Sequence, residues 1–221
     1  MRKKAALLTT LGLMVNLLLP QPVSADYLTG DLQRLHWLCN DYQLPIKGYV
    51  IEGWFSLYNR PGLQNTVEER LQIKAGQYQG NLLDGSALNS SMLQRGHKIY
   101  IELQLITEDF QIAQHYYALW QSFADTYKEC QPVGVTIITE FPECLTMHTR
   151  EQLLGELQQG LGVDETALHY LDSVQQASGY SPQLRHGLKI GGETINYNFA
   201  FAERDSQTIL YLATPVIYQQ Y

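Results

Sequence analysis

The sequence predicts an α+β fold in which two strand-helix-strand-strand units form antiparallel sheets that are covered by helices. Segments of alternating apolar and polar residues, which are typical of half-buried strands, recur along the chain. Segments with helical spacing separate them, and the order strand, helix, strand, strand occurs twice. Because no residue-level repeat accompanies this order, we infer a structural duplication from the elements alone.

The first 25 residues have the three parts of a secretory signal peptide. Basic residues 2–4 precede the apolar run 5–19 and the small residues Val23-Ser24-Ala25, so we expect cleavage after Ala25. An uncleaved membrane anchor is the alternative, but the apolar run is shorter than the roughly 20 residues that a spanning helix needs. The sequence therefore predicts a protein that is secreted or held in the cell envelope, with no membrane insertion after signal removal.

The predicted mature chain, residues 26–221, is strongly acidic. It keeps all 22 acidic residues and loses three of the 15 basic ones with the signal, which leaves a formal charge of −10. Such a charge repels nucleic acids and anionic lipid surfaces. We therefore expect no nucleic-acid partner.

The first predicted unit, residues 26–130, contains the clearest alternation of the chain, at residues 98–106. Thr66 and Glu69 have the spacing of a capping box, which predicts the start of a short helix. The expected elements, in order, are helix 31–42, strand 48–58, helix 66–76, loop 77–84, weak strand 87–94, strand 98–106 and connecting helix 112–127.

The second predicted unit, residues 131–221, ends in a hairpin over residues 192–217 and is expected to pack with the first as one globule. Before the hairpin we expect strand 133–141, helix 149–162 capped by Thr149 and Gln152, weak strand 174–180 and segment 188–190. The first hairpin strand is predicted to be half-buried, with two distinct faces. One face carries Ile195, Tyr197, Phe199 and Phe201, and the other carries Thr194, Asn196, Asn198 and Ala200.

Three cysteines, Cys39, Cys130 and Cys144, occur in the predicted mature chain. In an exported protein this odd number allows one disulfide and one thiol, or three thiols. A fully extended strand between Cys130 and Cys144 would hold them too far apart for a bridge, unless the flanking loops fold back. The pairing stays open.

Well-defined catalytic and nucleotide-binding motifs are missing from the sequence. It contains no G-x-S-x-G, H-E-x-x-H, G-x-x-x-x-G-K-[ST] or paired C-x-x-C motif. We therefore assign no catalytic residue, no metal ligand and no cofactor, and an enzyme is less favoured than a protein without catalytic activity.

Three weaker combinations are alternatives to ordinary structural roles. They are a metal site of Cys144 and His148 completed by Cys130 or His115, a nucleophile and base formed by Cys39 and His36, and acidic pairs at 164–165 and at Glu140 with Glu143. The spacing of the possible metal ligands matches no zinc module, and Cys39 and His36 lie at the edge of an amphipathic helix. Nothing in the sequence fixes the distance between the carboxylates of the third, so we favour structural roles throughout.

Aromatic residues on the less apolar faces of the predicted strands are the most suggestive binding candidates. Aromatic rings beside amide side chains can stack on sugars or bind a partner protein, although covering the sheet against helices is their more common role. The residues that we select as candidate binding residues are Trp54, Tyr100, Asn196 and Asn198.

Three segments resemble the YwmB family of exported proteins from Gram-positive, spore-forming bacteria. They are the strand at 98–106, the strand at 133–140, and Leu212-Ala-Thr-Pro-Val-Ile217 with the terminal Gln-Gln-Tyr221. The order of elements is also similar across essentially the whole mature chain, except at 63–90. The resemblance implies a TATA-box-binding-protein-like α+β fold, and it brings no catalytic residues because the family has no established activity. The fold label does not imply DNA binding.

The sequence thus favours a non-catalytic cell-envelope protein that binds a protein or a cell-wall glycan through a sheet face or groove. A secreted cell-wall hydrolase is the alternative. Nucleic-acid binding, which only the fold label suggests, is the least favoured function because of the charge and the signal peptide.

Overall fold

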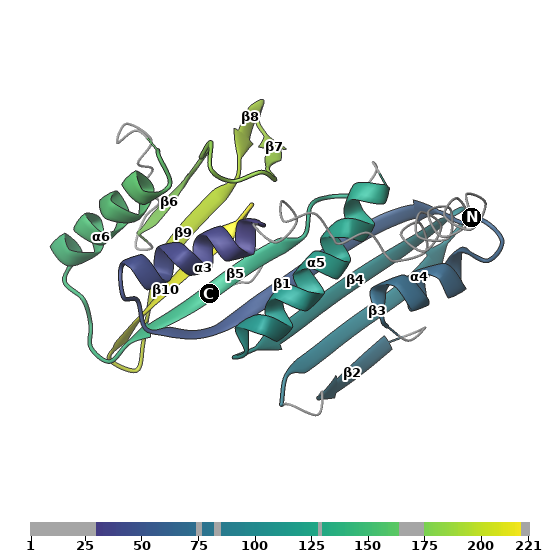
Figure 1. Cartoon of the computed structure of the whole chain (residues 1–221), viewed down its shortest axis with the longest axis horizontal. Coiled ribbons are helices and arrows are strands. Elements are labelled where there is room, and N and C mark those ends of the chain that lie inside the picture. Colours follow the sequence, from purple (N-terminus) through teal and green to yellow (C-terminus); the bar gives the residue numbers. More distant parts are fainter. Residues whose placement is uncertain (1–29, 74–76, 82–84, 128–129, 164–174, 218–221) are drawn as a thin grey trace, which may run out of the picture.

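The computed structural model describes residues 30–73, 77–81, 85–127, 130–163 and 175–217 (Figure 1). The expected signal peptide and the acidic pair at 164–165 lie outside these residues. The helices are α3 (Asp31–Asp41), α4 (Leu63–Leu71), α5 (Phe110–Thr126) and α6 (Met147–Gly160). The strands are β1 (Ile46–Tyr58), β2 (Gln77–Asn81), β3 (Ala87–Arg95), β4 (Lys98–Thr107), β5 (Gly134–Phe141), β6 (Gln176–Gly179), β7 (Leu188–Ile190), β8 (Glu193–Ile195), β9 (Tyr197–Arg204) and β10 (Gln207–Thr214).

Eight strands form one antiparallel sheet, in the order β2-β3-β4-β1-β5-β10-β9-β6, and β7 pairs separately with β8. The prediction of an α+β fold with helices on antiparallel strands is confirmed. The sheet has two halves that meet where β1 pairs with β5. Each half runs helix, strand, helix and then three sheet strands, with the β7–β8 hairpin inserted in the second half.

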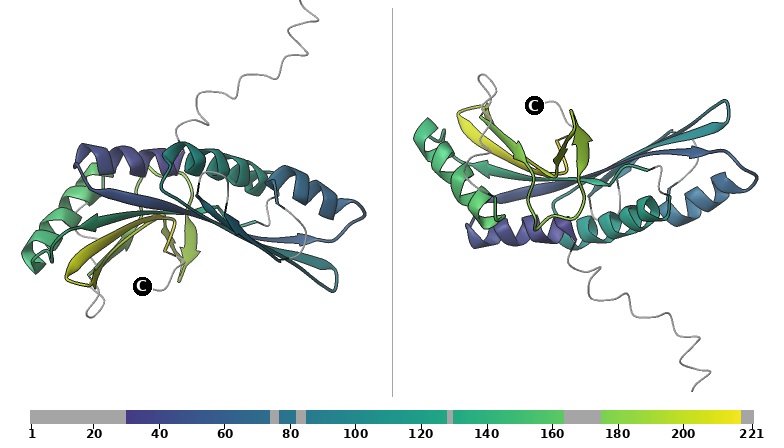
Figure 2. Two further views of the ribbon diagram at one scale, coloured as in Figure 1. Left: turned by 90° about the horizontal axis from the view of Figure 1, so that it is seen from below. Right: turned by 90° about the horizontal axis from the view of Figure 1, so that it is seen from above.

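One face of the sheet is buried beneath the helices. Successive strand residues point to opposite faces, so one row of inward side chains crosses the centre of the sheet. This row runs Thr107, Tyr49, Ile137, Leu212, Phe199 and Ala177, and every member is buried. Helices α3, α5 and α4 lie in a row over this face, along the length of the sheet (Figure 2). Within the described residues, none of the helices has the length and apolar character needed to cross a membrane.

The two helices at the centre cover strands of the opposite half. Helix α3, which precedes β1, packs on β5 and β10, whereas α5, which precedes β5, packs on β1 and β4 (Figure 1). The predicted boundary at residue 130 therefore separates α3 from the strands that it covers. Neither half keeps a complete apolar core without the helix that the other half contributes.

Two expectations for the first half are wrong. Residues Gln77–Asn81 form the edge strand β2 rather than a loop, because their backbone pairs with β3 although their side chains are mostly polar. Helix α4 begins at Leu63, so Thr66 lies inside it and does not cap it. Gly62 is the N-cap, with a φ of 78° that a glycine adopts without strain, and the Thr66 hydroxyl donates a hydrogen bond to its carbonyl oxygen.

The helix of the second half also begins earlier than its sequence suggests. Helix α6 starts at Met147, and the hydroxyl oxygen of Thr146 caps it by accepting a hydrogen bond from the Thr149 backbone N–H at 3.2 Å. Thr149 is therefore a residue of the first turn, and its predicted capping role is wrong.

The C-terminal hairpin is present as β9 and β10, but it is not half-buried. Its turn residues Asp205 and Ser206 have positive φ values of 49° and 68°, as a tight hairpin turn requires. Asn198 and Ala200 are buried, and so are the apolar residues on the other face of the same strand. The expectation of a half-buried strand is therefore wrong. Thr194 and Ile195 belong to β8, which pairs with β7 instead of β10.

A buried carboxylate connects the start of α3 to the loop before β7. Asp31 accepts hydrogen bonds from the backbone N–H groups of Arg185 and His186 at 2.8 and 3.0 Å. The Nδ1 atom of His186 lies 2.9 Å from the same carboxylate, and its Nε2 atom lies 3.9 Å from a carboxylate oxygen of Asp125 on α5. Three distant parts of the chain therefore meet around one imidazole.

The surroundings of His186 make stability depend on pH. Burial lowers the pKa of His186, but the hydrogen bond and charge of Asp31 and the charge of Asp125 outweigh burial and the opposing charge of Arg185, so this pKa is raised above its usual 6.5. A raised histidine pKa stabilises the fold fully below about pH 6.5. This contribution is lost as the pH rises through the higher folded-state pKa.

We expect His186→Gln to lower the free energy of unfolding by about 1 kcal/mol at pH 5.5, and by less at pH 8.5, because protonated imidazole makes the stronger pair with Asp31. Urea unfolding of both proteins at the two pH values measures this difference. His97→Gln is the matched control, since His97 is an exposed turn residue. An equal loss at both pH values would contradict the electrostatic role of His186.

Candidate functional site

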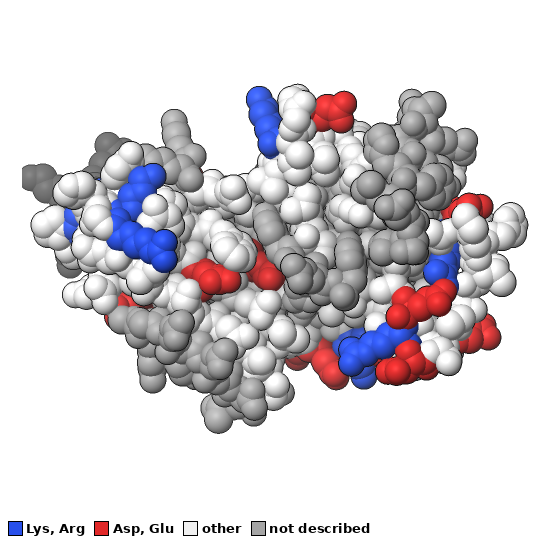
Figure 3. All heavy atoms as spheres, turned by 180° about the vertical axis from the view of Figure 1, so that it is seen from behind, with Lys and Arg blue, Asp and Glu red and all other residues white. Residues whose placement is uncertain are grey.

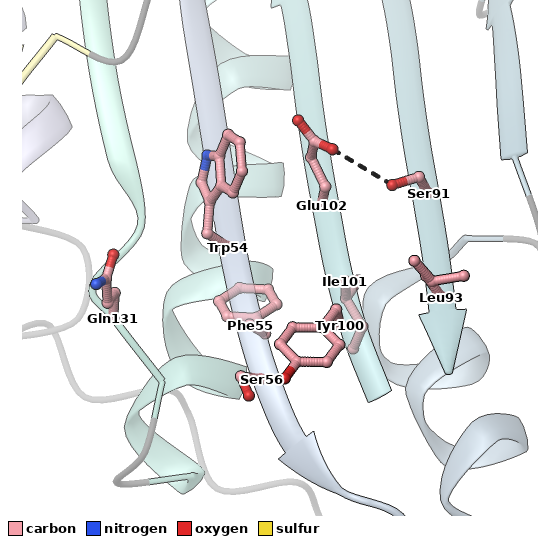
Figure 4. Close-up of a pocket in the computed structure, with 9 residues that line it drawn as sticks. All are labelled: Trp54, Phe55, Ser56, Ser91, Leu93, Tyr100, Ile101, Glu102 and Gln131. Carbon is pink, nitrogen blue, oxygen red and sulfur yellow. Dashed lines mark hydrogen bonds between the residues drawn. The ribbon is translucent and has the colours of Figure 1, made fainter. Parts of the chain in front are cut away.

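Large aromatic and apolar side chains are exposed on the face of β1, β3 and β4 that points away from the helices. Trp54 is 46% exposed, Tyr100 44% and Leu93 49%. Among the described elements, no helix lies on this side of the β3-β4-β1 half (Figure 2). The three side chains line an open groove of about 410 Å³ (Figure 4). Exposed apolar side chains that are bordered by polar groups often mark binding sites.

The strand register places polar groups beside these rings. Trp54 on β1 lies opposite Glu102 on β4, which lies opposite Ser91 on β3. In the next row, Ser56 lies opposite Tyr100, which lies opposite Leu93. The Ser91 hydroxyl donates a hydrogen bond to the Glu102 carboxylate at 3.4 Å (Figure 4). Gln131, from the segment before β5, forms the edge of the groove on the other side of β1.

A buried carboxylate lies next to the groove in the same outward column of β1. Glu52 is only 6% exposed, and it accepts a hydrogen bond from Gln104 Nε2 at 3.0 Å. Gln104 in turn accepts one from Asn89 at 3.1 Å, so three strands share a side-chain network. Burial raises the pKa of Glu52, and the charge of Glu102 adds to the increase, against the opposing hydrogen bond from Gln104.

Of the four candidate binding residues predicted from the sequence, Trp54 and Tyr100 meet in this groove, and Asn196 and Asn198 lie elsewhere. Asn196 is buried, accepts a hydrogen bond from the Ser181 N–H, and donates to the carbonyl oxygens of Ser181 and Leu184. Asn198 is buried in β9. The amide of Asn196 therefore holds the loop before β7 to the sheet.

Cys39 and His36 do not form a nucleophile and base. Cys39 is fully buried beneath the sheet, and burial raises the pKa of its thiol to about 12, so the reactive thiolate is disfavoured. The His36 ring stacks on Phe110 at 3.8 Å and pairs through Nδ1 with the Tyr49 hydroxyl at 2.9 Å. Both side chains contribute to packing between α3, α5 and β1.

The metal site of Cys144 and His148 that the sequence offers as an alternative is not formed in the described residues. Within this part of the chain, no group of three or more His, Cys, Asp or Glu side chains is placed to hold a metal ion. Cys144 and His148 are exposed near the start of α6. Glu140 lies at the end of β5, and the backbone carbonyl of Glu143 accepts a hydrogen bond from the Thr208 N–H.

A second groove, of about 680 Å³, lies at the opposite end of β1 and β4, where Lys47, Ser86 and Glu108 are among its lining residues. Several of its polar groups already serve the fold. The Ser86 hydroxyl donates to Thr107 Oγ1 at 2.8 Å, and the Asp109 carboxylate caps α5. The first groove is therefore the stronger candidate, because it combines exposed rings with accessible polar side chains.

Reasoning from the sequence did not select Glu52, Glu102, Ser91 or Leu93. The alternation of residues 48–58 and 98–106 places the two glutamates at outward positions of their strands. The missing information was that β1 pairs with β4, and β4 with β3, which brings all four residues to one surface. Such long-range pairing is not encoded in local periodicity.

Comparison with protein-family models and with curated proteins finds no match for this chain.

We expect Glu52→Gln to stabilise the protein at pH 7 and to leave its stability nearly unchanged at pH 4. A raised carboxyl pKa stabilises the fold below the ordinary pKa, and this contribution is lost as the pH rises through the folded-state value. Glutamine keeps the acceptor for Gln104 and removes the buried charge. Urea unfolding at both pH values measures the effect.

Glu193→Gln is the matched control for this prediction, because Glu193 is an exposed carboxylate on β8, outside the network of Glu52. We expect it to change the free energy of unfolding by about 0.5 kcal/mol or less at either pH. Lower stability of Glu52→Gln at pH 7 would show that the Glu52 charge contributes favourably to the fold, contrary to this account.

Proposed function

We propose that the chain is an exported, non-catalytic protein of the cell envelope that binds a protein or a cell-wall glycan through the Trp54–Tyr100 groove. The observation that carries this proposal is the exposure of both rings, at 46% and 44%, side by side on an open sheet face. Rings of this kind bury a large apolar area when they bind a partner. The sequence of residues 1–25 supports export.

The resemblance to the YwmB family supports the same proposal. The two halves of the sheet, with their repeated order of helices and strands, are compatible with the TATA-box-binding-protein-like architecture that this resemblance implies. Nucleic-acid binding does not follow from that architecture, because function depends on the site. Here Glu102 lies in the groove, and the predicted mature chain carries a charge of −10, both of which disfavour a polyanion.

A secreted hydrolase of the cell wall is the second candidate, and one observation favours it. Glu52, whose pKa is raised by burial, is close enough to Glu102 for their charges to interact, and glycoside hydrolysis uses two carboxyl groups of unequal pKa. However, Glu52 is almost completely buried and hydrogen-bonded to Gln104, so a substrate in the groove has little access to it. Binding without hydrolysis fits these contacts better.

A retention experiment tests the proposed function. Residues 26–221 are immobilised and incubated with envelope extract, and in parallel they are incubated with purified peptidoglycan and sedimented. We expect the wild-type chain to retain a component of the extract or to sediment with peptidoglycan. The double variant Trp54→Ala/Tyr100→Ala should show at least about tenfold weaker retention, because exposed aromatic rings dominate interface energies.

Trp37→Ala/Tyr180→Ala is the matched control, since Trp37 is 42% and Tyr180 57% exposed and neither lines the groove. Retention of nothing, or equal retention by all three proteins, would contradict the proposed function. Release of soluble fragments from peptidoglycan, if abolished in Glu102→Gln, would instead support the hydrolase.

A further inference from the structure

Charged groups of opposite sign lie at the two ends of the groove. Arg95 and Lys98, on either side of the β3–β4 turn, form the next outward row beyond Leu93 and Tyr100 and make the surface beside that end of the groove basic, whereas Glu102, which lines the groove, makes the other end acidic. On the left-hand half of Figure 3, which shows this face, basic side chains gather toward the outer end and acidic ones lie nearer the middle of the molecule. The charge therefore changes sign along the strands.

The strand register fixes the spacing of these charges. Lys98, Tyr100 and Glu102 all point outward from β4, and Arg95 lies opposite Lys98 on β3. Lys98 and Glu102 are four residues apart, which corresponds to about 13 Å along a strand. The Lys98 ammonium lies 5.0 Å from the centre of the Tyr58 ring on β1, which holds the positive charge over this end of the sheet.

The middle of the groove is apolar and has hydrogen-bonding groups at its edges. Tyr100 and Leu93 lie opposite one another, halfway between the basic and the acidic row, and Trp54 lies beside them. The hydroxyls of Ser56 and Ser91 and the amide of Gln131 border these side chains. A ligand that fits the whole groove therefore has an apolar centre and opposite charges at its ends.

We propose that the groove binds an extended peptide segment of about five residues, with an acidic group at one end, an apolar or aromatic residue in the middle and a basic group at the other. This proposal rests on the proposed function and names its ligand class. The first and fifth residues of an extended peptide lie about 13 Å apart, which matches the distance between the two charged rows along β4.

Other occupants fit these features less well. A neutral glycan can stack on Trp54 and Tyr100, but it has no charges to pair with Lys98 and Glu102. A polyanion is repelled by Glu102 at the acidic end. A second copy of the chain would present an equally hollow surface, and two hollow surfaces placed face to face leave a gap that neither fills. A narrow, dipolar peptide satisfies both the shape and the charge of the groove.

Titration calorimetry with three blocked peptides tests the proposal. Each is five residues long and has phenylalanine between two alanines in the middle. The first has aspartate at one end and lysine at the other, the second has aspartate at both ends, and the third has lysine at both ends. We expect wild type to bind the first about fivefold more tightly than either of the others, because each exposed ion pair contributes modestly. This preference should decrease at high salt.

Charge reversal at each end should change the preferred peptide. Arg95→Glu/Lys98→Glu makes both ends acidic and should prefer the peptide with two lysines. Glu102→Lys makes both ends basic and should prefer the peptide with two aspartates. Lys189→Glu and Glu193→Lys are the matched controls, because these exposed residues of β7 and β8 change the net charge in the same direction outside the groove.

The outcomes separate this inference from the proposed function. Two results would overturn the proposal of a dipolar ligand. One is that the affinity for the peptides does not depend on their end charges. The other is that the peptide preference changes as much in the β7–β8 control variants as in the groove variants. Retention of envelope material that requires Trp54 and Tyr100, together with competition by a tetramer of N-acetylglucosamine and no peptide binding, would replace the peptide by a glycan and leave the proposed function intact. Failure of the retention experiment itself would contradict the proposed function.

Discussion

The pairing of β1 with β5 is the contact on which the rest of the structure depends. It joins the two halves into one sheet, with Ile51 opposite Val135 on the helix side and Val50 opposite Thr136 on the other. Because α3 and α5 each cover strands of the opposite half, this pairing also positions both helices over one shared core. The groove depends on it as well, since β1 carries Trp54 and the segment before β5 carries Gln131.

The two halves share an order of elements but differ in what they expose. In the first half, outward residues such as Trp54, Tyr100 and Glu102 are open to solvent. In the second half, the outward residues Thr136, Ala213, Asn198 and Ala200 are buried. Within the described residues, the open aromatic surface therefore lies on the strands of the first half, with Gln131 of the second half at its edge.

Local periodicity was sufficient to predict the α+β class, the strands that contain Trp54 and Tyr100, and the outward direction of both rings. It was insufficient where backbone pairing or buried hydrogen bonds decide the outcome. Strand β2 has no apolar alternation and exists through its pairing with β3. Asn196 is polar yet buried, because its amide is satisfied by Ser181 and Leu184. The meeting of Glu102 with Trp54 needs the register between strands, which no local pattern contains.

The most direct test of the central claim, that the Trp54–Tyr100 face is the binding surface, is hydroxyl-radical footprinting of the mature protein with and without bound envelope material. The account predicts that Trp54 and Tyr100 are protected from oxidation when the material is bound. Trp37 and Tyr180, which are exposed to a similar degree outside the groove, should be oxidised at unchanged rates. Protection of Trp37 or Tyr180, with Trp54 and Tyr100 still oxidised as in the free protein, would contradict it.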